Sequence, residues 1–212
     1  MKDSLVVIPT FNEKENIERI IRKVFSLNKE FDVLVVEDNS PDGTAAIVRS
    51  LMAEFSGRLH MEERKGKLGL GTAYIHGFRW ALAKEYSYVF EMDADFSHNP
   101  EDLLKLYDAC ANQGGDVAIG SRYIKGVNVV NWPMGRVLMS YFASYYVRMV
   151  TGMKIMDTTA GFKCYRRKLL DTIDFDRIKF TGYAFQIEMK YTAWKLGFNI
   201  IAGWSPNIQW IG

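Results

Sequence analysis

The sequence has few cysteines, no long apolar run and almost no net charge, and each of these absences excludes a class of protein. Cys110 and Cys164 are the two cysteines among 212 residues. Their spacing suits neither a metal site nor a redox motif, so buried free thiols in a reducing compartment are expected. No run of about 18 apolar residues is present, so no segment is expected to cross a bilayer. The formal charge of +2 provides no basic field for nucleic acid.

The composition is that of an ordinary globular protein. Hydrophobic residues make up 48% of the chain and charged residues 25%. A chain of this length suits a single domain, 1–212, with a substantial core. The first ten residues, MKDSLVVIPT, contain an apolar run that is too short and too soon interrupted for a signal peptide. We expect them to begin a strand. We therefore expect a protein that is cytosolic or lies on the cytosolic face of a membrane.

Short apolar runs alternate with helical patterns through the first 120 residues. We expect strands at 4–8, 32–37, 58–63, 87–92 and 116–120. Helices are expected at 13–27, 44–55, 69–83 and 100–111, with Asn12 capping the first and Asn99 and Pro100 opening the last. The strands are apolar throughout, which predicts an α/β fold with a mostly parallel, Rossmann-like sheet flanked by helices. A strand at 160–165, a helix at 185–196 and a last strand at 198–202 are expected in the second half.

Two carboxylates follow the strand at 87–92. Asp93 and Asp95 are separated by Ala94 alone, so both can turn toward one point as the strand ends. Hard oxygen ligands of this kind suit Mg²⁺ or Mn²⁺, which completes its shell with substrate phosphates. A solvated turn that carries two acids is the alternative. His98, close by, is either a metal ligand or a hydrogen-bonded structural residue.

Polar turns also follow the other predicted strands, at 9–13, 37–44 and 121–122. In open α/β sheets, ligands bind at the carboxyl ends of the strands, so these turns and 93–98 are expected to form one site. Glu13 and Asp38 could accept hydrogen bonds from a nucleoside. Arg122 and Arg136 are candidate clamps for a diphosphate, or ordinary surface arginines.

A glycine-rich segment, KGKLGLG at 65–71, precedes the third predicted helix. Its amides could cradle a phosphate. It lacks the G-K-[ST] ending of a P-loop, and its glycines do not follow G-x-G-x-x-G. Asp42 and Gly43 are expected to form a turn and to cap the helix at 44–55.

The stretch 131–151 is amphipathic and rich in aromatic residues. An interfacial helix would present them at headgroup depth, and a helix that covers the core is the alternative. The basic residues around it favour an acidic lipid or a phosphate nearby. The aromatic residues are Trp132, Tyr141, Phe142, Tyr145 and Tyr146, and the basic ones are Arg136, Arg148, Lys154, Lys163, Arg166, Arg167 and Lys168.

The simplest chemistry for such a site is displacement at a nucleotide-sugar. No serine–histidine–acid or cysteine–histidine arrangement is readable. A metal and arginines would neutralise a departing diphosphate while an acceptor oxygen attacks. An acceptor that is already an anion, such as a phosphate, needs no strong general base.

Several motifs in order resemble the family-2 glycosyltransferases with the GT-A fold. Others narrow the resemblance to their dolichyl/polyprenyl-phosphate mannose synthase branch, over about residues 4–200. The first group is PTFNE at 9–13, VVEDNSPDGT at 35–44, KLGLGTAY at 67–74 and MDADFSHNP at 92–100, and the second is GSRY at 120–123, DTTAGFKCY at 157–165 and GYAFQIE at 182–188.

The resemblance implies an inverting transfer of mannose from GDP-mannose to a dolichyl or polyprenyl phosphate. The reaction would use Mg²⁺ or Mn²⁺ at the cytosolic face of a membrane, with a peripheral enzyme and possible anchoring by a partner subunit. A nucleotide-binding half is then expected at about 1–122 and an acceptor- and membrane-facing half at about 123–212. A different donor such as UDP-glucose, or a different acceptor, is the alternative within the family.

The resemblance also assigns residues. Asp93, Ala94 and Asp95 match the donor-phosphate and metal segment, and Arg122 matches an arginine that binds phosphate. Asp93, Asp95 and Arg122 are thus the expected catalytic residues. Ser97 stands where the family often has Gln, and its shorter hydroxyl is a weaker third metal ligand. The residues that match the guanosine pocket are Pro9, Phe11 (commonly Tyr in the family), Glu13, Val36 and Asp38.

The motif residues near 157 and 186 and the C-terminal end complete the comparison with the family. Asp157, Thr158 and 186–188 fall in family motifs without a clear role. The family continues past the last strand into an Arg and a G-x-S-K element that close over the phosphates, whereas this sequence ends in IIAGWSPNIQWIG. A weakly active chain that binds only nucleotide or a membrane partner is therefore the alternative from another class.

Overall fold

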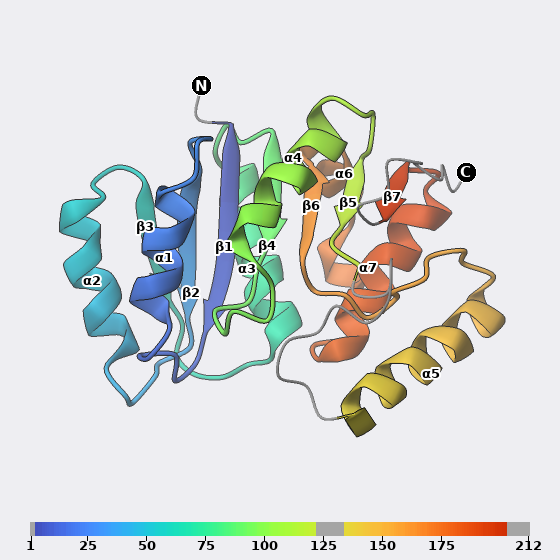
Figure 1. The fold of residues 1–212 in the computed structure, drawn as a ribbon, viewed down its shortest axis with the longest axis horizontal. Helices are drawn as coiled ribbons and strands as arrows, with labels where there is room; N and C mark the ends of the chain where they lie inside the picture. The colour runs from blue at the N-terminus through green and yellow to red at the C-terminus, as the bar shows by residue number, and fades with distance from the viewer. Residues whose placement is uncertain (1–2, 122–133, 203–212) are drawn as a thin grey trace.

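A computed structural model describes residues 3–121 and 134–202, with the backbone alone at 134, 136–138, 140 and 141. Its centre is a seven-stranded sheet in the order β3-β2-β1-β4-β6-β5-β7 (Figure 1). β6 runs antiparallel to both of its neighbours, and the other paired strands are parallel. The strands are β1 (Ser4–Thr10), β2 (Asp32–Glu37), β3 (Leu59–Glu63), β4 (Tyr88–Glu91), β5 (Val117–Ile119), β6 (Lys163–Arg166) and β7 (Ile200–Ala202). The predicted mostly parallel α/β fold is confirmed.

Helices cover both faces of the sheet and divide the core into two clusters. Val6 and its neighbours on one face pack under α1, α2 and α4, while Val7 and its neighbours on the other pack under α3, α6 and α7. Strands buried on both faces explain the unbroken apolar runs in the sequence. The helices are α1 (Ile17–Phe25), α2 (Thr44–Glu54), α3 (Leu70–Leu82), α4 (Leu103–Ala111), α5 (Met134–Thr151), α6 (Arg167–Thr172) and α7 (Tyr183–Lys195), with 3₁₀ turns at Pro100–Asp102 and Phe175–Arg177.

The start of the first helix was predicted wrongly. α1 begins at Ile17, and Asn12 has a left-handed φ of 62° rather than a capping role. The amides of Asn12 and Glu13 donate instead to the hydroxyls of Ser40 and Thr44, both at 3.0 Å. These bonds connect the turn after β1 to the turn after β2, and α1 therefore begins at Ile17 rather than at 13.

Other local predictions are confirmed. Asn99 accepts the Glu101 amide at 3.1 Å and opens the turn before α4. Asp42 accepts the Thr44 amide at 3.0 Å at the start of α2. α6 and the Phe175–Arg177 turn were not predicted.

Gly77 of α3 allows the helix to lie directly on the sheet. A Cβ at this position would lie 2.4 Å from Cγ1 of Val7 in β1. We expect Gly77→Ala to lower the free energy of unfolding by about 1–3 kcal/mol, because overpacking must move the helix or the strand. The matched control is Gly135→Ala in α5, where a Cβ would meet nothing within 4 Å. Urea unfolding measures both, and an equal midpoint for the two variants would contradict the close approach.

Candidate active site

A cavity of about 600 Å³ lies where β1, β2 and β4 end. Val36 does not line it, since that side chain is fully buried in the core. Arg122 and Trp132 lie outside the described residues, as do the side chains of Arg136 and Tyr141. The predicted residues that the structure brings together around this cavity are Pro9, Phe11, Glu13, Asp38, Asp93, Ala94, Asp95 and Ser97.

The turns that follow β1, β2 and β4 each contain one residue with a left-handed backbone conformation. Asn12 follows β1, Asn39 follows β2 and Phe96 follows β4, with φ of 62°, 58° and 55°. Asparagine tolerates this conformation, whereas an aromatic residue rarely adopts it. The amide of Ser97 donates to Oδ1 of Asp95 at 2.9 Å and closes the third turn. The Asp93–Ser97 segment therefore holds a strained conformation at the mouth of the site.

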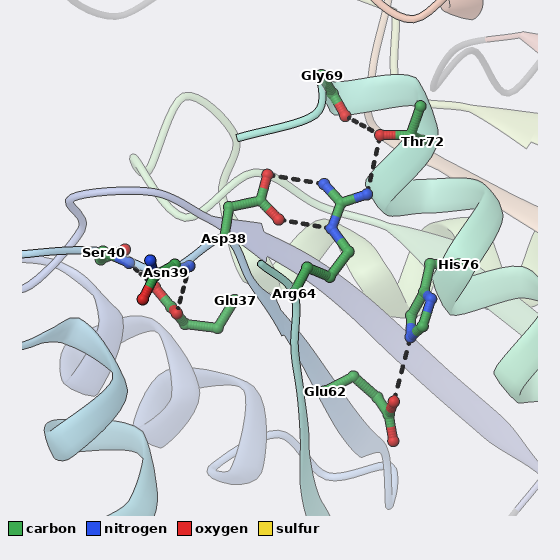
Figure 2. Close-up of polar contacts among 9 residues, drawn as sticks. All are labelled: Glu37, Asp38, Asn39, Ser40, Glu62, Arg64, Gly69, Thr72 and His76. Atoms are coloured by element: carbon green, nitrogen blue, oxygen red, sulfur yellow. Dashed lines mark hydrogen bonds and ion pairs between the residues drawn. The ribbon is translucent and has the colours of Figure 1, made fainter. Parts of the chain in front are cut away.

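Asp38 is held by a forked ion pair that sequence reasoning missed (Figure 2). Nε and Nη2 of Arg64 donate to its two carboxylate oxygens at 2.6 and 2.7 Å. Both side chains are only 8% exposed. Nη1 of Arg64 donates to the Thr72 hydroxyl, which donates to the Gly69 carbonyl. Arg64 fixes the direction of the Asp38 carboxylate, whose remaining lone pairs can still accept.

Asp93 is the most perturbed acid of the site. The Tyr74 hydroxyl donates to its Oδ1 at 2.9 Å. Burial raises the pKa of Asp93 to about 6, and the carboxylates of Asp95 and Glu91 add to this effect while the Tyr74 bond opposes it. Asp95 is exposed on the rim. Burial, with a contribution from Asp95, also raises the pKa of Glu13.

Asp93, Asp95 and Ser97 supply hard oxygen atoms at one end of the cavity, which is the donor chemistry that Mg²⁺ and Mn²⁺ prefer. Among the described residues, no three His, Cys, Asp or Glu side chains gather closely enough to hold a metal alone. An ion here would need oxygen ligands from a substrate. The ring of His98 stacks on Phe162 with centroids 4.9 Å apart.

A buried polar cluster forms the floor beneath Asp93. Glu91 and Lys163 are cross-strand partners on β4 and β6, with Nζ 3.2 Å from Oε1. The Tyr165 hydroxyl and Nε2 of Gln186 each donate to Glu91 at 2.8 Å, and Lys163 also donates to Oε1 of Gln186. All four side chains are fully or almost fully buried. Burial lowers the pKa of Lys163, and the two carboxylates nearby oppose that shift.

Several basic residues that the sequence suggested for lipid or phosphate binding have structural roles instead. Lys163 belongs to the buried cluster. Nε of Arg166 donates to the Cys110 carbonyl at 2.8 Å, and Nη2 of Arg167 donates to the Leu82 carbonyl at 2.7 Å. These side chains hold β6 and α6 against the rest of the domain.

The glycine-rich segment is close-packed. The Gly71 amide donates to the Thr181 carbonyl at 2.7 Å. A Cβ at Gly69 or Gly71 would lie within 3.0 Å of Thr181 or Phe185 atoms. Lys67 lies over the Phe11 ring, 4.7 Å from its centroid. Contact with the loop before α7 explains these glycines, and Lys67 is the member of the segment that offers a charge to the cavity.

One wall of the cavity comes from α5 and α7. Met139 and Ala143 of α5 and Tyr183 of α7 line it. α5 is attached by Ser144, which accepts the Thr158 hydroxyl at 3.1 Å. Its other face is apolar and exposed, so the alternative of a core-covering helix is wrong for this face. The exposed apolar side chains are Met139, Phe142, Tyr145, Tyr146, Met149 and Val150, at 56–74%.

The fold is an open α/β sheet with an acidic cavity at the carboxyl ends of its strands, which is where such sheets bind ligands. A family model described as glycosyl transferase family 2 matches residues 5–174. The chain belongs to this family, as the resemblance predicted.

Two curated relatives are similar over most of the chain. A polyprenol monophosphomannose synthase from Mycolicibacterium smegmatis is 44% identical over 93% of this chain and 74% of its own length. An undecaprenyl-phosphate mannosyltransferase from Micrococcus luteus is 42% identical over 93% of this chain and 80% of its own. Both names agree with the predicted branch of the family.

Solved structures share the fold at low sequence identity. A mannosyltransferase from Pyrobaculum calidifontis, in complex with GDP-mannose and Mn²⁺, aligns with TM-score 0.62 and 18% identity. It matches 99% of this chain, which spans only 56% of that one. Glucosyl-3-phosphoglycerate synthase from Mycobacterium tuberculosis, in a complex that holds Mn²⁺ and UDP, aligns with TM-score 0.67 and 17% identity over 95% of this chain and 69% of that one. Within the described residues, no helix is both long and apolar enough to cross a membrane.

The raised pKa of Asp93 predicts that this residue destabilises the metal-free fold. The penalty of its ionised form appears as pH rises from 3.8, its ordinary value, to about 6, and persists above that. We expect Asp93→Asn to raise the free energy of unfolding by about 1–2 kcal/mol at pH 7.5 and to leave it unchanged below pH 4. Urea unfolding in EDTA measures this difference.

The matched control for that measurement is Asp176→Asn, at an exposed ion pair with Arg79, for which a change below about 0.5 kcal/mol is expected. A loss of stability in the Asp93 variant at pH 7.5 would show that its carboxylate is not strained by burial.

Proposed function

We propose that this chain transfers mannose from GDP-mannose to a polyprenyl phosphate, with inversion, at the cytosolic surface of a membrane. The observation that supports this most directly is a single cavity that runs from Asp38 and the Asp93–Asp95 rim to Met139 on the exposed apolar face of α5. A polar donor and a lipid acceptor could meet there. The names of the 44% and 42% identical relatives agree with this acceptor class.

The donor nucleotide would lie along the rim formed by β1 and β2. Asp38, oriented by Arg64, offers acceptors for the N–H groups of a guanine edge, and Phe11 offers a ring face. Glu13, which also lines the cavity, would accept hydrogen bonds from the ribose hydroxyls. Pro9, Ala94 and the backbone of Val36 would complete the pocket as the resemblance implies.

The donor diphosphate would lie near Asp95 and Ser97. Asp93, Asp95 and Ser97 fit Mg²⁺ or Mn²⁺, which when bound would neutralise the negative charge of the diphosphate. We propose Arg122 as a further phosphate ligand from the family motif, and Lys67 from its place on the cavity wall. These charges would stabilise GDP as it leaves.

In the reaction, an oxygen of the lipid phosphate attacks C1 of mannose from the side opposite the diphosphate. The C1–O bond to GDP breaks as the new C1–O bond forms, which inverts the configuration. The acceptor is already an anion at neutral pH and needs no proton removed, which agrees with the absence of a serine–histidine–acid arrangement from the sequence motifs. A nucleotide-binding half at about 1–122 and an acceptor-facing half at about 123–212 would divide these tasks. An anchoring partner subunit stays a prediction.

The proposed function is tested by transfer from labelled GDP-mannose to a polyprenyl phosphate in detergent, with Mn²⁺ or Mg²⁺ and with EDTA. We expect metal-dependent product, and a loss of at least about 100-fold in kcat/KM for Asp95→Ala, because charge stabilisation of the leaving group is lost. Asp176→Ala, at an exposed ion pair with Arg79, is the matched control and should retain activity.

Competition by UDP-glucose tests the donor in the same assay, and stronger competition than by GDP would overturn the choice of base. GDP binding without transfer would favour the reading of the chain as a nucleotide-binding protein.

The exposed face of α5 is expected to enter the headgroup region of a bilayer. Replacing Phe142, Tyr145 and Met149 together with Ser should weaken association with anionic liposomes at least about tenfold. The reason is that transfer of exposed apolar side chains from water into the bilayer lowers the free energy of the bound state. Flotation measures binding, and circular dichroism should show an intact fold. Leu196→Ser, at a similarly exposed apolar residue outside α5, is the control. Unchanged flotation of the triple variant would contradict the interfacial role.

A further inference from the structure

Gly161 lies directly across from Asp93 where β4 and β6 meet the cavity. The antiparallel register pairs Glu91 with Lys163, so Asp93, two residues after Glu91, lies opposite Gly161, two residues before Lys163. Both residues line the cavity, and Gln186 of α7 lines it beside them. This corner holds one carboxylate, one amide and no side chain from residue 161.

The orientation of the Gln186 amide follows from its two buried partners. The Lys163 ammonium can only donate, so the atom that faces it is Oε1. The Glu91 carboxylate can only accept, so the atom that faces it is Nε2, at 2.8 Å. This bond uses one of the two Nε2 protons, and the described part of the chain offers no hydrogen bond to the second. Gln186 is 1% exposed, so an unmet proton here is costly.

The space above Gly161 lies between this amide and Asp93. A Cβ built on Gly161 would lie 3.5 Å from Nε2 of Gln186 and 3.6 Å from Oδ2 of Asp93. The Tyr74 bond goes to the other carboxylate oxygen, Oδ1. A ligand atom placed a little above the Cβ position can reach a donor and an acceptor at once.

We propose that this corner is a subsite for one hydroxyl group of the transferred sugar, with Gln186 as a binding residue. The hydroxyl accepts from Nε2 of Gln186 and donates to Oδ2 of Asp93, while Gly161 leaves it room. This inference rests on the proposed function, because the donor must be a nucleotide-sugar. The buried Glu91–Lys163 pair fixes the orientation of the Gln186 amide that would bind this hydroxyl.

The chemistry of the corner favours a hydroxyl over the other parts of a nucleotide-sugar. A phosphate oxygen has no proton to donate to Oδ2 of Asp93, so it can satisfy only the Gln186 amide. A base edge is better served at Asp38 and Arg64 beside β2, on the other side of β1. A hydroxyl both donates and accepts, which matches one carboxylate and one amide proton.

The first test compares the binding of GDP-mannose and of GDP to wild-type protein and to Gly161→Ala by calorimetry with Mn²⁺. The added methyl group makes only ordinary contacts with the protein, so the fold and GDP affinity should be retained. GDP-mannose should bind about tenfold more weakly, the effect of losing one hydrogen bond to a ligand. Gly135→Ala in α5 is the matched control and should bind both ligands as wild type does.

The second test uses Gln186→Met with GDP-mannose analogues that lack one hydroxyl at position 2, 3, 4 or 6. For one analogue, wild type and variant should bind equally, because the hydroxyl that Gln186 contacts is already absent. Equal losses for all four analogues would overturn the subsite, as would unchanged GDP-mannose affinity in Gly161→Ala.

The inference and the proposed function fail in different ways. If the sugar-dependent difference in binding disappears in Gly161→Ala but wild type transfers nothing to a polyprenyl phosphate, the subsite stands and the acceptor is wrong. If transfer occurs and neither variant alters binding of the sugar, the function stands and the subsite is wrong.

Discussion

The arrangement of the site depends on the buried ion pair between Glu91 and Lys163. A buried pair gains little by itself, because each charge loses its hydration, and it is tolerated only when further hydrogen bonds complete it. Tyr165 and Gln186 provide those bonds. The pair joins β4 to β6, the antiparallel strand that interrupts an otherwise parallel sheet. It thereby sets the position of the segment before β6 relative to Asp93, and a second buried lysine, Lys190, binds the carbonyls of Thr158 and Ala160 in the same segment.

Above this floor, the rim concentrates negative charge at the cost of stability. Asp93 is held with a pKa raised by burial to about 6, and Phe96 adopts a left-handed backbone in the turn that carries Asp95. Neither feature helps the metal-free protein to fold. Strain and crowded charge are typical of sites whose missing partner is a ligand. Arg64 neutralises Asp38 at one end of the cavity, whereas no ion pair with Asp93 or Asp95 is present among the described residues.

The sequence predicted the strands and the acidic turns well because both depend on local patterns. Apolar runs that end at an acidic residue place Asp38, Asp93 and Asp95 at one edge without further information. Contacts between distant segments were harder to predict. Lys163 was grouped with surface basic residues, because nothing near it in the chain shows that Glu91 lies opposite. Arg64 had a usable signal, since it directly follows β3 and must emerge at the same edge as Asp38. No sequence pattern other than the family motif indicated a role for Gln186, because that role depends on how α7 packs.

The position of α5 links the polar and apolar parts of the cavity. Ser144 and Val147 attach one side of this helix to the domain, and six large apolar side chains on the rest of it stay exposed. A soluble protein gains nothing from such a face, which is the kind that lies against a partner or a bilayer. Met139 belongs to both the exposed face and the cavity wall. A lipid phosphate at the headgroup level would therefore reach the Asp93 corner without leaving the membrane surface, while a nucleotide could approach along β1 and β2 from water. The proposed hydroxyl subsite at Gln186 and Asp93 lines the same cavity as Met139, so the sugar and the lipid phosphate could meet there.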